Sequence, residues 1–162
     1  MKIKEIYKKI IPSDNYQSRR DFCNHHLIDN LSEKEKLLIE NMLIEDLNSR
    51  YDLLLIETLT YLNSTKSISV IEEKLKKINE AFDKIVIARC LYKLEKDKSK
   101  MIDLAYDNFL LITNDYIKIT LFYYLVKFNS NKILKLVKSY TGNKNILLAH
   151  NSKAALQEAP RE

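Results

Sequence analysis

The residues of this chain best suited to chemistry are Cys23, His25 and His26, which lie close together near the N-terminus. A thiolate beside an imidazole can act as a nucleophile with its base, or the two can share a metal ion. Cys23 and His26 are one helical turn apart, but no Cys-X-X-Cys or His-X-X-X-His motif supports them, and the one other histidine is His150. We therefore interpret Cys23 as a core thiol, His26 as half-buried and His25 as exposed. We predict no catalytic residue, no metal site and no cofactor.

Two helices are expected to position these residues. Isoleucines recur at helical spacing within residues 2–11, and Pro12 ends that helix. A second helix is expected over about residues 17–30. Its apolar side carries Phe22, Cys23, Leu27 and Leu31.

A pattern of twelve residues recurs three times in the rest of the chain, beginning at Asp52, Asp83 and Asp115. These aspartates are 31 and 32 residues apart. In each copy an aliphatic residue stands two positions on, isoleucine four on and tyrosine nine on: Leu54, Ile56 and Tyr61; Ile85, Ile87 and Tyr92; Ile117, Ile119 and Tyr124. Internal repeats with a period of about 20–50 residues are typical of stacked arrays. The pattern therefore predicts a repeat architecture.

Each of these segments follows another helical pattern, so the expected repeating unit is a pair of helices. The first helices are expected over about residues 32–48, 67–78, 99–112 and 130–140, and the second over about 50–63, from 83, from 115 and over 145–156. Ser32 and Glu35 predict a capping box at the start of the first pair. Gly142 stands where a left-handed residue would close a helix of the fourth, less regular pair.

Composition favours an all-α protein. One glycine and two prolines in 162 residues leave little room for hairpins or phosphate-binding loops, which depend on conformations that glycine adopts most easily. No apolar segment is long enough to span a membrane, and the N-terminus lacks the apolar core of a signal peptide. Two cysteines without a spacing motif fit a reducing compartment. We expect a soluble cytoplasmic protein that does not bind membranes.

The net charge of +5 suggests nucleic acid as a partner, because clustered cations bind phosphates by releasing counterions. However, 22 of the 27 cations are lysine, and arginine is the better planar clamp for phosphate. We therefore interpret most of the positive charge as a solvated surface.

Paired helices of roughly 32 residues, the second opening with Asp and carrying Ile85, Ala88, Leu91 and Tyr92, resemble HEAT or armadillo α-solenoid repeats. The resemblance covers about residues 32–156. It implies a short right-handed α-solenoid of about four helix pairs, a curved stack that binds macromolecules and in which catalysis is the exception. We expect one domain over residues 1–162, with N-terminal helices in 1–31, repeats in 32–157 and a disordered tail in 158–162.

The Asp-led helices each have two apolar faces. Positions four, seven and eleven after Asp share one face, and positions two and nine lie nearly opposite. The second face carries Tyr61, Tyr92 and Tyr124, which are either core residues with hydrated hydroxyl groups or anchors for a partner. We predict a partner-binding surface formed by Tyr61, Arg89, Tyr92, Lys93, Tyr124 and Lys127.

Three classes of function remain open. The first is a non-enzymatic module that binds a protein and has no small-molecule substrate. By its size and expected surface it resembles the small helical immunity proteins of bacterial toxin systems, which occlude a toxin or enzyme. The second is a basic nucleic-acid-binding protein whose lysines converge on one concave face. The third is an enzyme that uses Cys23 and His26, with a pocket around their helix. We expect the first class.

Overall fold

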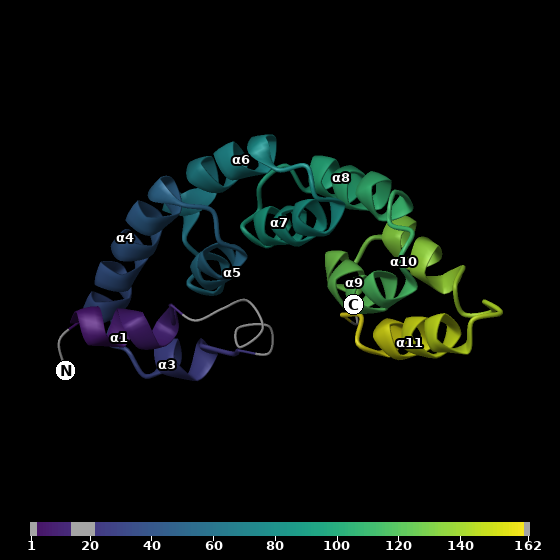
Figure 1. Cartoon of the computed structure of the whole chain (residues 1–162), viewed down its shortest axis with the longest axis horizontal. Helices are drawn as coiled ribbons and strands as arrows, with labels where there is room; N and C mark the ends of the chain where they lie inside the picture. Colours follow the sequence, from purple (N-terminus) through teal and green to yellow (C-terminus); the bar gives the residue numbers. More distant parts are fainter. Residues whose placement is uncertain (1–2, 14–21, 161–162) are drawn as a thin grey trace. The chain divides into compact units, whose positions relative to one another are not determined.

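A computed structural model describes residues 3–13 and 22–160, and the regular secondary structure of this part of the chain is all helical (Figure 1). It holds ten α-helices and two short 3-10 helices, and no β-strand occurs among the residues described. The predicted all-α class is therefore confirmed. By internal packing the chain divides into two compact units, Met1–Lys74 and Leu75–Glu162. Each is described by itself, and a single domain over the whole chain remains a prediction.

The first unit begins with α1 (Ile3–Ile10), which packs against α3 (His25–Asp29) and α4 (Glu33–Ser49). The predicted helix over 2–11 is confirmed in its described part. The predicted helix over 17–30 is wrong at its centre, because residues 22–24 are not helical; residues 14–21 lie outside the described ranges. Asn24 provides the physical reason. Its buried side-chain amide donates to the Ile10 carbonyl oxygen at 3.2 Å and to the Thr58 hydroxyl at 2.8 Å, which fixes the chain just before α3.

Helix α4 begins at the predicted capping box. The Glu35 amide donates to the Ser32 hydroxyl, while the Ser32 amide donates to the Glu35 carboxylate at 2.9 Å. Hydrogen bonds from the Ser32 side chain and backbone lower the pKa of Glu35. Helix α5 (Leu53–Tyr61) packs against α4, and Asp52 caps it by accepting from the Leu54 amide. The buried core residues of these two helices are Ile39, Leu43, Leu47, Leu55, Ile56 and Leu59.

A polar network joins α1, α4 and the start of α5. Asp46 accepts from the Tyr7 hydroxyl at 2.6 Å and from two guanidinium nitrogens of Arg50, each at 2.8 Å. The third guanidinium nitrogen donates to Asp52 at 2.7 Å. The hydrogen bonds from Arg50 are the main cause that lowers the pKa of Asp46, whereas burial, together with Asp46, raises the pKa of Tyr7. Bidentate arginine–carboxylate pairs are among the stronger polar contacts in proteins, so this network fixes how α1 lies against α4.

A 3-10 helix, η1 (Thr65–Ser67), leads into α6 (Ile68–Lys77), and the last three residues of α6 belong to the second unit. Within the first unit, two lysine ammonium groups, one on η1 and one on α6, tie this segment to α4. Lys66 pairs with Glu40 at 3.4 Å, and Lys74 donates to the Asn48 carbonyl oxygen at 3.4 Å.

In the second unit, each helix packs mainly against helices one or two places away in the chain. Its elements are α7 (Ala81–Lys93), α8 (Lys98–Leu110), α9 (Asp115–Leu125), η2 (Val126–Phe128), α10 (Asn131–Lys138) and α11 (Ile146–Gln157). Helix α7 packs against α8 and α9, α9 packs against α11, and α8 packs against α10. Fully buried phenylalanines, Phe109 and Phe122, lie 5.8 Å apart between ring centroids at the centre of this packing.

Helices α5 and α7 end in the same way. Asn63 and Glu95 follow α5 and α7 in the left-handed conformation, with φ of 54° and 64°. The next amides, of Ser64 and Lys96, reach back five residues to carbonyl oxygens at 3.0 and 2.9 Å, which completes a Schellman motif at each site. Asn129, after η2, is also left-handed, with φ of 44°. The predicted left-handed Gly142 is wrong, since no glycine has a positive φ.

The repeated aspartates all lie near the start of a helix, but they do not share one role. Asp52 is the N-cap of α5, Asp83 is the third residue of α7, and Asp115 is the first residue of α9, which Asn114 caps. A carboxylate near a helix N-terminus is favourable at all three positions because it faces the positive end of the helix dipole. The repeat therefore marks helix starts to within a few residues.

Asp46→Asn should flatten the pH dependence of stability in acid. The pKa of Asp46 is lower in the folded chain than the unfolded value of about 3.9. Its contribution to the free energy of unfolding is therefore complete above about pH 5 and is lost as pH falls through the folded pKa. Urea unfolding followed by circular dichroism between pH 7 and 2 measures this. Glu45→Gln controls for the loss of one negative charge from α4, and parallel pH curves for Asp46→Asn and the wild type would contradict the network.

Glu95→Gly should stabilise the protein by about 1 kcal/mol, because glycine adopts the left-handed conformation without steric cost. The surface ion pair that the change removes, Glu95 with Lys98 at 2.6 Å, contributes little by comparison. Thermal unfolding checks the sign, with Glu95→Ala as the control that removes the ion pair but keeps the strain. A Glu95→Gly variant no more stable than Glu95→Ala would contradict the Schellman assignment.

Candidate partner-binding surface

Five of the six residues predicted to bind a partner lie on elements of the second unit that contact one another. They are Arg89, Tyr92 and Lys93 on α7, Tyr124 on α9 and Lys127 on η2. Helix α7 packs against both α9 and η2. We refer to these five residues as the tyrosine–cation surface. The sixth residue, Tyr61, belongs to α5 of the first unit.

Arg89 and Tyr124 form the centre of the tyrosine–cation surface. The guanidinium carbon of Arg89 lies 5.2 Å from the centroid of the Tyr124 ring, a cation–π arrangement. The Phe82 ring meets the same tyrosine edge-on, with centroids 6.2 Å apart. All three side chains are half-buried. Their mutual contacts hold the arginine and the tyrosine in one geometry.

Tyr92 lies where α7 meets η2. Its ring packs at a tilt against fully buried Phe128, with centroids 5.1 Å apart, and the Lys98 ammonium lies 5.2 Å from its centroid. A hydrogen bond to Glu95 raises the pKa of Lys98, so this cation stays charged near the ring. Tyr92 is half-buried, and its ring covers the edge of the core.

Lys93 and Lys127 supply the exposed charges of the surface. The Lys127 ammonium donates to the Glu158 carbonyl oxygen at 3.1 Å and lies 4.0 Å from the Glu158 carboxylate. This contact ties η2 to the segment that follows α11. Rigid tyrosine and arginine side chains beside accessible cations can stack, donate hydrogen bonds and pair with acidic groups.

Tyr61 has a different local role. Its hydroxyl donates to the Asp29 carboxylate at 2.7 Å, and its ring stacks on His25 with centroids 3.7 Å apart and planes only 4° from parallel. The hydrogen bond to Asp29 is the main cause that raises the pKa of Tyr61. The repeat grouped Tyr61 with Tyr92 and Tyr124, but within its own unit this tyrosine holds α3 to α5.

The cysteine and the two histidines near the N-terminus all lie at the surface of the first unit. Cys23, His25 and His26 are all exposed, so the predictions of a core thiol and a half-buried His26 are wrong. The physical reason is that α3 begins only at His25, so Cys23 does not follow the helical phase from which its burial was expected. Across residues 3–13 and 22–160, no group of three or more His, Cys, Asp or Glu side chains is placed to hold a metal ion.

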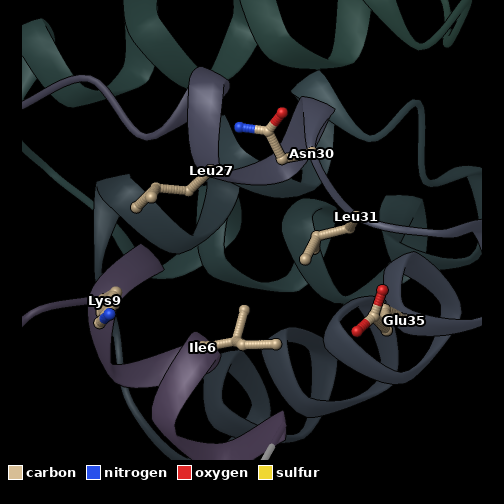
Figure 2. A pocket seen from close by; sticks show the side chains of 6 residues that line it. All are labelled: Ile6, Lys9, Leu27, Asn30, Leu31 and Glu35. Carbon is tan, nitrogen blue, oxygen red and sulfur yellow. The ribbon is translucent and has the colours of Figure 1, made fainter. Parts of the chain in front are cut away.

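A hollow of about 340 Å³ lies between α1, α3 and α4 in the first unit (Figure 2). It is lined by Ile6, Lys9, Leu27, Asn30, Leu31 and Glu35. Figure 2 shows Ile6 and Leu31 pointing toward its middle, with Lys9 and Glu35 on opposite sides. Glu35 serves the capping box, and the Asn30 amide donates to the His26 carbonyl oxygen at 2.7 Å. Neither Cys23 nor His26 lines this hollow, so it offers apolar surface but no catalytic set.

A second, shallower hollow of about 560 Å³ lies between α8 and α10. Lys132 crosses it, with its ammonium 4.4 Å from the Tyr106 ring centroid and 2.6 Å from the Asp103 carboxylate. Lys135 and Ser139 complete the polar lining. The lysines of α10 therefore lie on a mixed surface, in which Lys132 is paired with an acid.

Sequence reasoning missed a cluster of exposed apolar side chains at the ends of helices in the second unit. Its members are Leu110 and Leu111 at the end of α8, Tyr116 and Ile117 at the start of α9, and Ile146 and Leu147 at the start of α11. We call these six residues the apolar edge. Each pair consists of adjacent apolar residues at a helix terminus, and adjacent positions point about 100° apart, so a terminus that is covered on one side only leaves part of such a pair exposed. That signal was available in the sequence.

No family model, no curated protein and no solved structure matches this chain. The described helices include none with the length and apolar character needed to cross a membrane.

The two cysteines should differ sharply in reactivity, because Cys23 is exposed and Cys90 is fully buried in α7. A thiol reagent such as Ellman's reagent should modify about one thiol per native chain and both in urea. Cys23→Ser should abolish the native reaction, while Cys90→Ser should leave it unchanged. Rapid modification of both thiols in the native chain would contradict the burial of Cys90.

Proposed function

We propose that this chain is a non-enzymatic module that binds a protein partner through the tyrosine–cation surface. The observation that carries the proposal is the packing of α7 against α9 and η2, which gathers Arg89, Tyr92 and Tyr124 beside two exposed lysines. Tyrosine and arginine are enriched among the residues that dominate binding energy at protein interfaces. Side chains already held by internal contacts lose less entropy on binding, which favours affinity.

We infer that the second unit is a short α-solenoid. Helices α7, α9 and α11 pack in succession, and α8 packs against α10, as two parallel rows of a repeat stack would. A left-handed residue follows each copy of the sequence pattern: Asn63 after α5, Glu95 after α7 and Asn129 after η2. A right-handed stack of about four pairs over residues 32–157 rests on the sequence repeat.

The finer proposal is a bacterial inhibitor of the immunity type, which covers a toxin or enzyme in the cytoplasm. The tyrosine, arginine and lysine side chains gathered on α7, α9 and η2 support it, because such residues are favoured where proteins bind proteins. The surface carries net positive charge from Arg89, Lys93 and Lys127, so an acidic patch on the partner is expected. A gene for a toxin beside the gene for this chain, and inhibition of that toxin by the purified protein, would be the direct signs.

Nucleic acid is the second candidate, and the hollow between α8 and α10 favours it. Tyr106 offers a ring for stacking and Lys135 an exposed cation, which together suit a single strand. Binding of a fluorescent 20-nucleotide RNA that falls steeply with salt, and that Lys135→Glu with Lys138→Glu weakens, would support this candidate. Retention of that binding when both lysines are changed would count against it.

A photo-cross-linking amino acid at position 93 or 127, in the cell from which the chain comes, should form a covalent adduct with one protein. Both positions are exposed, so the substitution leaves the core intact. Lys93→Glu combined with Lys127→Glu should weaken binding of that protein by at least tenfold, with unchanged helicity by circular dichroism, because two attractive charges become repulsive.

The matched control is Lys100→Glu with Lys153→Glu, which makes the same change of charge on exposed positions of α8 and α11. The control should retain binding. Equal losses for the two double variants would show that net charge, rather than this surface, governs the interaction. Adducts that contain nucleic acid would favour the second candidate.

A further inference from the structure

The side chains of the apolar edge are unusually exposed for large apolar residues. Ile146 is 81% exposed, Tyr116 75% and Leu111 70%. The six side chains together expose on the order of 600 Å², taking about 150–250 Å² for a fully exposed large side chain. Contiguous apolar patches of more than a few hundred Å² on soluble proteins mark interaction sites.

Two of the residue pairs of the apolar edge are neighbours in space, and the third adjoins one of them along the chain. Helices α9 and α11 pack against each other, and the Asn145 amide donates to the Asp115 carboxylate at 2.9 Å. Asp115 directly precedes Tyr116, and Asn145 directly precedes Ile146, so this hydrogen bond joins the first turns that carry two of the pairs. The third pair enters the short loop from α8 to α9, and buried Phe109 fixes the preceding turn.

Local charge distinguishes the apolar edge from the rest of the chain. Within four positions along the chain of its six residues stand two acids, Asp107 and Asp115, and two lysines, Lys118 and Lys144. Their charges cancel, whereas the whole chain carries +5. A surplus of lysines here would attract an acidic partner, and no such surplus is present. A surface without net charge can meet its own copy without repulsion between like charges, and its Asp115 and Lys118 already lie 3.9 Å apart within one chain.

We propose that the apolar edge is the contact surface between two copies of this chain, related by a twofold axis. A twofold interface brings the same patch of both copies together, so a patch of balanced charge and apolar centre complements itself. The exposed area is a large part of the about 800 Å² that each partner contributes to a standard interface. The tyrosine–cation surface uses other residues, so the dimer stands or falls independently of the proposed function.

Sedimentation equilibrium of the whole chain over about 1–500 μM tests the proposal. The wild type should show a monomer–dimer equilibrium that persists in 0.5 M NaCl, because an apolar contact of zero net charge is not weakened by screening. Ile146→Asp and Tyr116→Asp should each weaken the dimer at least tenfold. Both changes place an acid in the first turn of a helix, where it favours the helix, so folding is retained.

Leu37→Asp is the matched control, because it makes the same substitution at an exposed apolar residue of α4. It should leave the dimer constant unchanged. A direct readout comes from Ile146→Cys in a Cys23→Ser background, which should form a disulfide-linked dimer on mild oxidation, while Leu37→Cys in that background should not. A chain that is monomeric at all concentrations, or a dimer that neither Asp variant of the apolar edge weakens, would overturn the proposal.

Discussion

Burial of α7 on several sides at once is the constraint on which the second unit depends. Ile85, Val86, Ile87, Ala88, Cys90 and Leu91 are all buried, so apolar residues surround most of this helix. A helix of this kind has to be covered by neighbours, and α8, α9 and η2 provide the cover. Arg89 and Tyr92 are the positions that remain at the boundary between this core and solvent. Their side chains are therefore placed by core packing rather than by loops.

The first unit depends on polar contacts to a greater degree. The Asp46 network and the buried Asn24 amide define how α1, α3, α4 and α5 meet, in addition to an aliphatic core. A buried amide is costly unless it is hydrogen-bonded, so Asn24 selects one arrangement of these helices. Tyr61 belongs to the same group of contacts through Asp29 and His25.

Much of the helical pattern could be predicted from the sequence, because helix starts are set by local chemistry. The Ser32 capping box and the register of the repeat are examples of such local signals. The short α3 could not be predicted in this way, because its start depends on contacts of Asn24 with the distant residues Ile10 and Thr58. Similarly, helix termini took the left-handed conformation at Asn63 and Glu95 rather than at the one glycine. Asparagine adopts this conformation more readily than most residues, whereas Glu95 adopts it against its local preference.

The candidate site was predictable in part. Periodicity placed Tyr92 and Tyr124 at the same position of their helices, and the packing of α7 against α9 brings these two helices together. The engagement of Tyr61 by Asp29 and the exposure of Cys23 depend on how α3 is held, which no repeat encodes. The apolar edge arises where adjacent apolar residues begin or end helices. Periodicity is judged over a whole helix, so it does not single out the exposed residues at the ends.

Hydrogen–deuterium exchange on the chain with and without its cross-linked partner would test the central claim most directly. If the tyrosine–cation surface is the binding site, backbone amides from 89 to 96 and from 124 to 129 become protected, while those of α3 and α4 do not change. Protection confined to the hollow between α1, α3 and α4, or to α10, would contradict the account.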